Sequence, residues 1–172
     1  MKFYLSGGME YKENLGKGWR DVITRELAKV GHEAIDPVKI EEQSETATTY
    51  NWSEEKKASD LGSYKSMVRK YMFRKDMQAI QECDAVILNY DLSVQKGAGS
   101  LAEAWEAFRE GRPVYVFTDF PIKQVPGWLI GESTEIFRTR EEVVKYVSAP
   151  GKVREDVWHA QLVRDLCLEG VY

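Results

Sequence analysis

Two apolar runs that flank a glycine loop and a helical pattern constrain this chain more than any other feature. Residues 84–90 and 113–117 are apolar without a period-2 alternation, which is typical of parallel strands buried on both faces. Between them, Leu101, Ala104 and Phe108 recur at helical spacing after the loop of residues 97–100. Strand, helix and parallel strand form a right-handed βαβ unit, and open α/β sheets bind ligands beyond the carboxyl ends of their strands. We therefore expect the functional site at this loop.

The remaining segments extend this unit into a larger sheet. We expect further strands at residues 2–6, 33–36 and 134–137, and helices at about 19–30, 63–82, 125–130 and 140–147. Gly31 follows the first helix as a C-cap glycine would, and Thr139 with Glu142 has the spacing of a capping box. The pattern predicts a single-domain α/β sandwich, flavodoxin-like or Rossmann-like, with a five-stranded, mostly parallel sheet and helices on both faces.

Length and patterning divide the chain into one domain and an arm. A chain of 172 residues can bury a real core in one domain but is short for two. Residues 1–149 form the expected domain, with a long polar insertion at about 41–63 that could act as a lid. Residues 150–172 form an arm whose apolar side chains must pack on their own domain or on a second subunit. We expect a homodimer or a higher homo-oligomer.

Composition excludes several classes of protein. A hydrophobic fraction of 43% excludes a disordered chain, and the absence of an apolar run near 20 residues predicts no membrane span. A net charge of −4 argues against polymeric nucleic acid as a partner. Cys83 and Cys167 lack the spacing of a zinc site, and the first residues begin a strand rather than a signal peptide. We expect a cytoplasmic protein without a structural metal.

Glu103, at the start of the expected central helix, has two interpretations. Ser100 and Glu103 have the spacing of a capping box, in which the two side chains satisfy backbone N–H groups at the helix start. In the functional interpretation, the helix dipole keeps the carboxylate ionised in the sheet crevice. Glu103 is then a nucleophile toward an electrophilic carbon.

Asp76 lies on the apolar face of the helix expected at 63–82, three or four residues from Met72 and Ile80. It can be tied to a backbone N–H or to Arg74 or Lys75, as a structural carboxylate. Alternatively, it is a partly desolvated acid with a raised pKa that donates a proton to a leaving group. One ionised and one protonatable carboxylate in a single pocket are what retaining glycosyl transfer needs.

Two glycine loops could hold a phosphate on their backbone N–H groups, although tight turning is the more common use of such loops. The first contains Gly7 and Gly8, and the second contains Gly97 and Gly99. Neither has the spacing of a P-loop or of a dinucleotide fingerprint.

Four further side chains attract attention through their residue type. His32 and His159 have no partner at ligand or triad spacing, so we interpret both as structural. Trp52 and Trp128 lie in polar or loop contexts and are candidates for ring-stacking walls of a site.

Taken in order, several motifs of residues 1–120 resemble a known family. The run YLSGG at residues 4–8, Asp76 seven residues before the run CDAVI, and the run GAGSLAE at 97–103 followed by GRPV are similar to nucleoside 2-deoxyribosyltransferases. They equally resemble the related 2′-deoxynucleoside 5′-monophosphate N-glycosidases. The closing EGVY resembles the family's C-terminal tail.

The resemblance implies roles for individual residues. Glu103 matches the nucleophile that forms a covalent deoxyribosyl ester, Asp76 the acid that protonates the departing base, and Tyr4 a tyrosine that orients the nucleophile. Gln124 matches a position through which a neighbouring subunit closes the sugar pocket, and Tyr172 completes a pocket through the tail. The implied substrates are a deoxynucleoside or deoxynucleotide and a free nucleobase, and no cofactor is needed.

One departure from the family keeps other substrates open. Gly97 stands where the family often has an Asp that helps to bind the base, which leaves base preference undetermined. With Ser6 and Ser100, the glycine loops could suit a 5′-phosphate, so a hydrolase acting on deoxynucleoside monophosphates is the main alternative. The expected substrate contacts are Ser6, Gly7, Gly8, Gly97, Gly99, Ser100, Gln124 and Tyr172.

Two further alternatives lie outside this family. Lysine-decarboxylase-like phosphoribohydrolases also set a glycine loop before a helical Glu, but their paired-glycine signature is absent here. A nucleotide-sensing module would keep the pocket without turnover.

Overall fold

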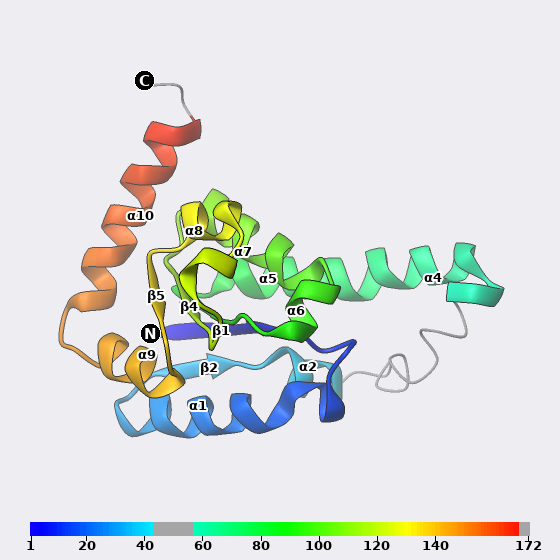
Figure 1. The fold of residues 1–172 in the computed structure, drawn as a ribbon, viewed down its shortest axis with the longest axis horizontal. Helices are drawn as coiled ribbons and strands as arrows, with labels where there is room; N and C mark the ends of the chain where they lie inside the picture. The colour runs from blue at the N-terminus through cyan, green and yellow to red at the C-terminus, as the bar shows by residue number, and fades with distance from the viewer. Residues whose placement is uncertain (43–56, 169–172) are drawn as a thin grey trace.

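A computed structural model describes residues 1–42 and 57–168 of the chain. At its centre lies a five-stranded parallel sheet in the order β2-β1-β3-β4-β5, which is flavodoxin-like (Figure 1). The strands are β1 (Lys2–Gly7), β2 (Glu33–Ile35), β3 (Ala85–Asn89), β4 (Val114–Phe117) and β5 (Glu135–Phe137). The predicted fold class is confirmed.

Helices cover both faces of the sheet, and each strand sends alternate side chains to opposite faces (Figure 1). On one face, Phe3, Leu5 and Ile87 pack against α1 (Lys17–Lys29) and α9 (Arg140–Val147). On the other face, the strands pack against α5 (Arg74–Glu82), α7 (Gly99–Arg109) and α8 (Gly127–Glu132). Burial on both faces explains why the strand sequences show no alternation.

Local signals set several element ends as predicted. Helix α9 begins with a capping box, in which the Thr139 side chain accepts from Glu142 N and the Glu142 side chain reaches back to the cap. Gly31 follows α1 with a φ of 76°, the left-handed conformation that favours glycine after a helix.

The helix expected at 63–82 is present as an unbroken helical stretch from residue 61 to 82. It consists of α4 (Leu61–Met67), a π-helical segment η3 (Val68–Phe73) and α5. Asp60 caps its start, because its Oδ1 accepts a hydrogen bond from Ser63 N at 3.0 Å. The expectation of a start at Ser63 was therefore two residues late.

Within residues 1–42 and 57–168, four short elements were not predicted. They are η1 (Glu13–Gly16), α2 (Pro37–Glu42), α6 (Leu92–Lys96) and η4 (Ile122–Gln124). Each is too brief to show a helical repeat in the sequence. Most of the insertion predicted at 41–63 lies outside the described residues, as do Tyr50 and Trp52.

The arm consists mainly of one helix, α10 (Lys152–Leu168), which extends away from the sheet (Figure 1). Its N-terminal half packs on the domain, since Val153 is buried in the apolar cluster that includes α9 and Asp156 accepts a hydrogen bond from Tyr115 at 2.9 Å. The division into 1–149 and 150–172 stays a prediction.

None of the helices in the described part of the chain is both long and apolar enough to cross a membrane.

Candidate active site

The carboxylate of Glu103 on α7 is held by two hydroxyl groups of β1. Tyr4 Oη donates to Oε1 at 3.1 Å, and Ser6 Oγ donates to Oε2 at 2.5 Å. Strand geometry explains this pairing, because Tyr4 and Ser6 are two residues apart and so point to the same face of the sheet as α7. Both side chains are completely buried. The structure thus fixes both oxygens of Glu103 through neutral donors.

Burial and hydrogen bonding shift the pKa of Glu103 in opposite directions. Burial raises its pKa above the ordinary value of a glutamic acid, while hydrogen bonds from Ser6 and Tyr4 and the positive charge of Arg20 favour the ionised form. The pKa of Tyr4 is raised well above its ordinary value, chiefly by burial and then by the neighbouring negative charge of Glu103. Tyr4 is therefore a hydrogen-bond donor and not a base at neutral pH.

The capping interpretation of Glu103 is wrong. The N-cap of α7 is Ala98, with no side-chain hydrogen bond, and the first turn of the helix contains no acidic residue. Glu103 therefore lies in the second turn, where the electrostatic effect of the helix dipole is small. The carboxylate points to β1 instead of the helix start. Hydrogen bonds from Ser6 and Tyr4, and the charge of Arg20, favour the ionised form of this carboxyl group against the effect of burial on its pKa.

A small cavity of about 140 Å³ brings Glu103 and Asp76 together. Asp76 comes from α5, which packs on the same face of the sheet as α7. The remaining walls come from the loop after β1, from η3 and α5, from α6 and from the start of α7; they are Gly7, Gly8, Met9, Glu10, Tyr11, Met72, Phe73, Met77, Ser93, Val94, Gly97, Gly99, Ser100 and Ala102. Both predicted glycine loops thus line the same cavity as the two carboxylates.

Gly8 is required by close packing. A Cβ atom placed on Gly8 would lie 1.9 Å from Ser93 Oγ and 2.6 Å from Ser93 Cβ, closer than real Cβ atoms approach. Ser93 is itself held in place, because its N donates to Oδ1 of Asp91, the residue that caps α6. The loop after β1 therefore lies directly against the start of α6.

A second, wider cavity of about 660 Å³ adjoins this one and shares Tyr11 and Ser93 with it. Its walls come from α1, the carboxyl ends of β3 and β4, and the start of α9. Ligand pockets usually measure about 300–1,000 Å³, so the 140 Å³ cavity is smaller than a usual ligand pocket. A larger ligand would extend beyond the cavity that Glu103 lines.

Several predicted residues lie elsewhere. Ser6 does not line the small cavity, and its hydroxyl proton goes to Glu103. Gln124 is exposed on η4, away from both cavities. Trp128 is 72% exposed on α8, where its ring lies 5.7 Å from that of Trp105, so it forms no wall of this site. Tyr172 lies outside the described residues.

The two histidines are placed away from the cavity. His32 Nε2 lies 3.3 Å from Val147 O, and its ring contacts Phe3. His159 is exposed on α10. Within residues 1–42 and 57–168, no group of three His, Cys, Asp or Glu side chains is arranged to hold a metal ion.

Sequence reasoning missed Arg20 and Tyr11. Arg20 lies on the face of α1 that carries Ile23 and Leu27, and it is completely buried. A charged residue on an apolar helix face is the signal that singled out Asp76, and it would have identified Arg20 as well. Tyr11 offered no such signal, because it follows the glycine loop in an irregular segment.

Comparison with known proteins supports the fold. No protein-family model matches the chain, and no curated protein matches it in sequence. A 2-deoxyribosyltransferase from the psychrotolerant bacterium Bacillus psychrosaccharolyticus matches with a TM-score of 0.60 and 17% identity, over 85% of this chain and 92% of that chain. A CMP N-glycosidase from Clostridium botulinum matches with a TM-score of 0.47 and 18% identity, over 86% of this chain and 98% of that chain. At such identity the first match shows the fold alone.

Proposed function

We propose that this chain is a nucleoside 2-deoxyribosyltransferase, which cleaves the N-glycosidic bond of a 2′-deoxynucleoside and transfers the sugar to another base. The observation that carries the proposal is the Glu103 carboxylate, held by Tyr4 and Ser6 at a cavity that Asp76 also lines. The motif resemblance and the fold shared with a bacterial 2-deoxyribosyltransferase support the same assignment.

In the first step, a Glu103 oxygen attacks the anomeric carbon of the sugar. The carbon–nitrogen bond to the base breaks, its electron pair leaves with the base, and Asp76 supplies the proton that the departing ring nitrogen needs. The product is a deoxyribosyl ester of Glu103. Tyr4 and Ser6 hold the carboxylate in a fixed orientation. A nucleophile that is already oriented lowers the entropic cost of the attack.

In the second step, a nitrogen of the incoming base attacks the anomeric carbon and Glu103 leaves as a carboxylate. Asp76 takes up the proton that the incoming nitrogen loses, which returns the site to its starting state. Two displacements at the same carbon give net retention of configuration. The scheme uses no metal ion or organic cofactor.

A hydrolase with the same intermediate is the second candidate. Four glycines, Gly7, Gly8, Gly97 and Gly99, line the cavity with Glu103. The N–H of Gly97 already donates to Val94 O at 3.2 Å, and the backbone N–H groups at Gly8 and Gly99 suit a 5′-phosphate. Gly97 also stands where the resembling family often has an Asp for the base. Water would then resolve the ester, and the substrate would be a 2′-deoxynucleoside 5′-monophosphate.

Product analysis separates these candidates. The protein is incubated with deoxynucleosides, and separately with their 5′-monophosphates, with and without an excess of a different free base. A new deoxynucleoside that appears only when both partners are present supports transfer. Free base released from monophosphates without an exchange product supports the hydrolase instead.

The Glu103→Ala variant separates an enzyme from a nucleotide-sensing module. The transferase should keep substrate binding and lose base exchange by orders of magnitude, because the covalent intermediate cannot form. Base exchange that survives near the wild-type rate would contradict the mechanism. No turnover in either protein, with nucleotide binding retained in both, would favour the sensor.

A further inference from the structure

The wide cavity of about 660 Å³ lies at the carboxyl ends of β3 and β4 and adjoins the small cavity. Its volume falls within the range of about 300–1,000 Å³ that ligand pockets usually have. Glu103 and Asp76 line the small cavity but not the wide one. The proposed mechanism places the departing base beside Asp76, so it leaves the wide cavity to another ligand.

Aromatic rings form much of the wall of the wide cavity. Trp19 and Phe117 make an edge-to-face pair with ring centroids 5.5 Å apart. Tyr90 and Phe120 make a second such pair at 5.7 Å. Trp19 and Phe117 are 8% exposed and Tyr90 is 2% exposed, so the core holds these rings in place. Walls of fixed aromatic rings suit a flat ring as ligand, because stacked or edge-on contacts bury its faces.

The charges around the wide cavity balance. Basic and acidic side chains are equal in number among its lining residues: Lys12, Arg138, Arg140, Asp91, Asp119 and Glu141. Within this set, Lys12 pairs with Asp91, and Arg140 Nε lies 2.8 Å from Glu141 Oε1. A nucleoside di- or triphosphate, which carries several negative charges, finds no excess of positive charge here. The cavity therefore suits a ligand without a net charge.

Polar groups that can bind the edge of a ring also line the wide cavity. Asn89, at the end of β3, is half-buried there, and its side-chain amide both donates and accepts hydrogen bonds. The loop after β4 is held by Arg138, whose Nη2 donates to Asp119 O at 2.7 Å. Side-chain amides pair with the donors and acceptors at the edges of nucleobases. A flat, uncharged ring that carries donors and acceptors on its edge, as a nucleobase does, fits these walls.

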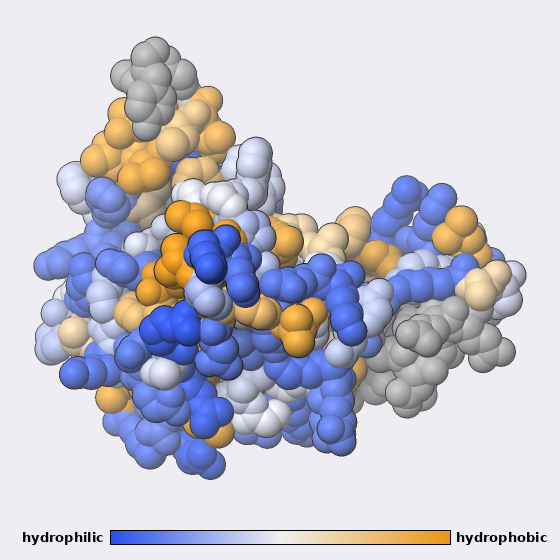
Figure 2. Space-filling view, in the orientation of Figure 1, coloured by the Kyte–Doolittle hydropathy of each residue, from blue (hydrophilic) through white to orange (hydrophobic). Residues whose placement is uncertain are grey.

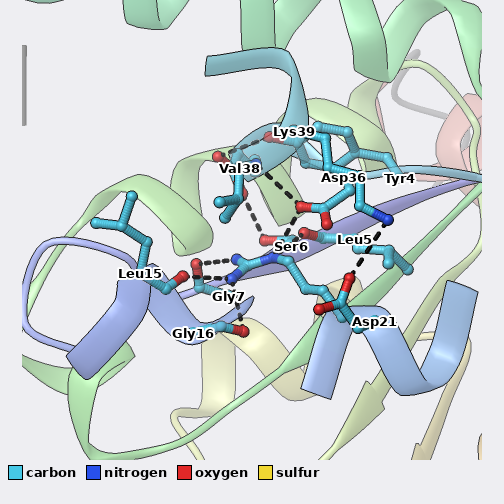
Figure 3. Close-up of polar contacts among 12 residues, drawn as sticks. Tyr4, Leu5, Ser6, Gly7, Leu15, Gly16, Asp21, Asp36, Val38 and Lys39 are labelled. Carbon is cyan, nitrogen blue, oxygen red and sulfur yellow. Dashed lines mark hydrogen bonds and ion pairs between the residues drawn. The ribbon is translucent and has the colours of Figure 1, made fainter. Parts of the chain in front are cut away.

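Two side chains connect the cavities, because Tyr11 and Ser93 line both of them. The segment that carries Tyr11 is anchored near its two ends by Arg20. Nη2 of this arginine donates to Gly7 O at 2.7 Å and Nη1 donates to Leu15 O at 2.8 Å (Figure 3). The shared wall is therefore held in place, and a ligand in the wide cavity would contact side chains that also border the reacting sugar.

We propose that the wide cavity binds the nucleobase ring of a second molecule, a nucleoside or a free base, while the small cavity holds the reacting sugar. That this molecule is a second one rests on the proposed function, which places the departing base beside Asp76. Binding in the wide cavity itself needs no turnover. It is therefore measurable whether or not the chain transfers deoxyribose.

The test follows one reporter in each cavity in the Glu103→Ala protein, where no ester can form. Trp19 lines only the wide cavity of the two, and Met77 only the small one. Fluorine NMR of 5-fluorotryptophan and ¹³C NMR of methionine methyl groups give the signals, which Trp19→Phe and Met77→Leu identify. The ligands are the 2′-deoxynucleosides of adenine, guanine, cytosine and thymine, and adenine and cytosine as free bases. At least one deoxynucleoside should move both signals, with different concentrations at half-saturation.

Variants of the wall locate the second ligand. Phe120→Ala should weaken the binding that Trp19 reports about tenfold or more, since stacking on an aromatic side chain is lost, and should leave the Met77 curve unchanged. Trp128→Ala removes an exposed aromatic side chain that lines neither cavity, so both curves should stay unchanged. Asn89→Leu keeps the size of the side chain and removes the amide. It should weaken the Trp19 curve too, and it replaces Phe120→Ala if that variant is unfolded.

Three results would overturn the proposal. The first is a Trp19 signal that none of these ligands moves at millimolar concentration. The second is a single curve shared by Trp19 and Met77 and weakened for both in Phe120→Ala, which would show one ligand that spans the two cavities. The third is indole binding as tightly as adenine, which would show recognition of an apolar ring alone. If the Trp19 signal moves as expected and the Met77 signal does not respond, the proposed function loses its reacting site while binding in the wide cavity stands.

Discussion

Glu103 is an ionisable group in surroundings that favour its neutral form. Its oxygens accept hydrogen bonds from Tyr4 and Ser6, and burial raises its pKa nonetheless. A carboxylic acid with a raised pKa stabilises the fold fully at low pH, and this contribution is lost as the pH rises through the raised value. An ionised Glu103 at neutral pH therefore costs stability. Sites that trade stability for reactivity commonly behave in this way.

Replacing Glu103 with Gln should reveal this cost. The variant keeps the shape of the side chain and removes the buried charge, so we expect a gain of about 1 kcal/mol in the free energy of unfolding at pH 7. The gain should shrink toward low pH, where the wild-type carboxyl is protonated. Activity should fall by orders of magnitude in the same variant. Thermal denaturation across a pH series, with turnover measured in parallel, checks this prediction; a variant less stable than the wild type at pH 7 would contradict it.

For single residues, the sequence predicted which carboxylates line the small cavity better than it predicted their hydrogen-bond partners. Glu103 and Asp76 stood out because carboxylates are uncommon beside glycine loops and on apolar helix faces. The hydrogen-bond partners of Glu103 were not predictable, since spacing alone suggested Ser100 as its partner. That pairing depended on a helix start at residue 101, whereas α7 begins at Gly99. A shift of two residues turns the Glu103 side chain from the helix end toward β1.

The loop after β1 provides a test at the scale of a single element. Gly8→Ala would force its new Cβ into Ser93, so the loop and α6 must move apart. We expect a loss of about 1–3 kcal/mol in the free energy of unfolding, as for other overpacked sites, and a large loss of activity. Gly99→Ala is the matched control, because no atom lies within 4 Å of its Cβ position and alanine favours the helix. Equal stability of the two variants in urea denaturation would contradict this packing.

Helix α8 contains a buried carboxyl group that the site does not use. Glu132 is 6% exposed, and its carboxylate has no hydrogen-bond partner among the described residues. Burial raises its pKa to about 7 from an ordinary 4.5, an effect that nearby Trp128 opposes only in part. Its contribution to stability is therefore complete below pH 4.5 and is lost as the pH rises through about 7.

Glu132→Gln should stabilise the protein in a pH-dependent way. We expect about 1–3 kcal/mol at pH 8, where the wild-type carboxylate is ionised and unpaired, and no gain at about pH 4. Glu155→Gln on the exposed side of α10 should have no effect at either pH. Urea titrations at the two pH values measure the difference; the same gain at both would show that ionisation of Glu132 is not the cause.

Element prediction succeeded where burial left a pattern and failed where it did not. All five strands were predicted, because continuous apolar runs between turn residues are distinctive. Helix α6 was missed because five residues show no repeat, although Asp91 before Ser93 is a capping signal. The π-helical segment η3 contributes Met72 and Phe73 to the cavity, and no sequence pattern predicts it.

At the scale of the whole molecule, the sheet order explains where the site lies. Strand β1 is flanked by β2 and β3, so the chain reverses direction across the sheet between β1 and β3. The loops after these two strands separate there and leave a crevice. Glu103 follows β3, its partners Tyr4 and Ser6 lie on β1, and the loop after β1 lines the small cavity, which places the cavity at this switch point. The sequence predicted a site at the loop of residues 97–100, and the small cavity lies beside that loop.

The C-terminal arm leads us to predict that the protein forms a homo-oligomer. Helix α10 extends from the domain, and hydrophobic residues gather on the surface of its outer part (Figure 2). On this helix Trp158 is 66% exposed and Leu168 is 48% exposed. We predict a homodimer or higher homo-oligomer that covers them, since exposed apolar clusters mark interaction surfaces. Light scattering should give more than a monomer mass at micromolar concentration. Trp158→Glu should shift the mass toward the monomer, whereas Arg154→Gln on the same helix should not; a monomeric wild type would contradict the prediction.

The central claim is that Glu103 carries the sugar between two bases. The most direct measurement is mass spectrometry of the protein quenched in acid during turnover of a deoxynucleoside without acceptor base, followed by proteolysis. We predict a mass increase of one deoxyribosyl group on the peptide that contains Glu103, its loss when free base is added before quenching, and no increase in Glu103→Ala. Turnover without any adduct, or an adduct on a different residue, would contradict it.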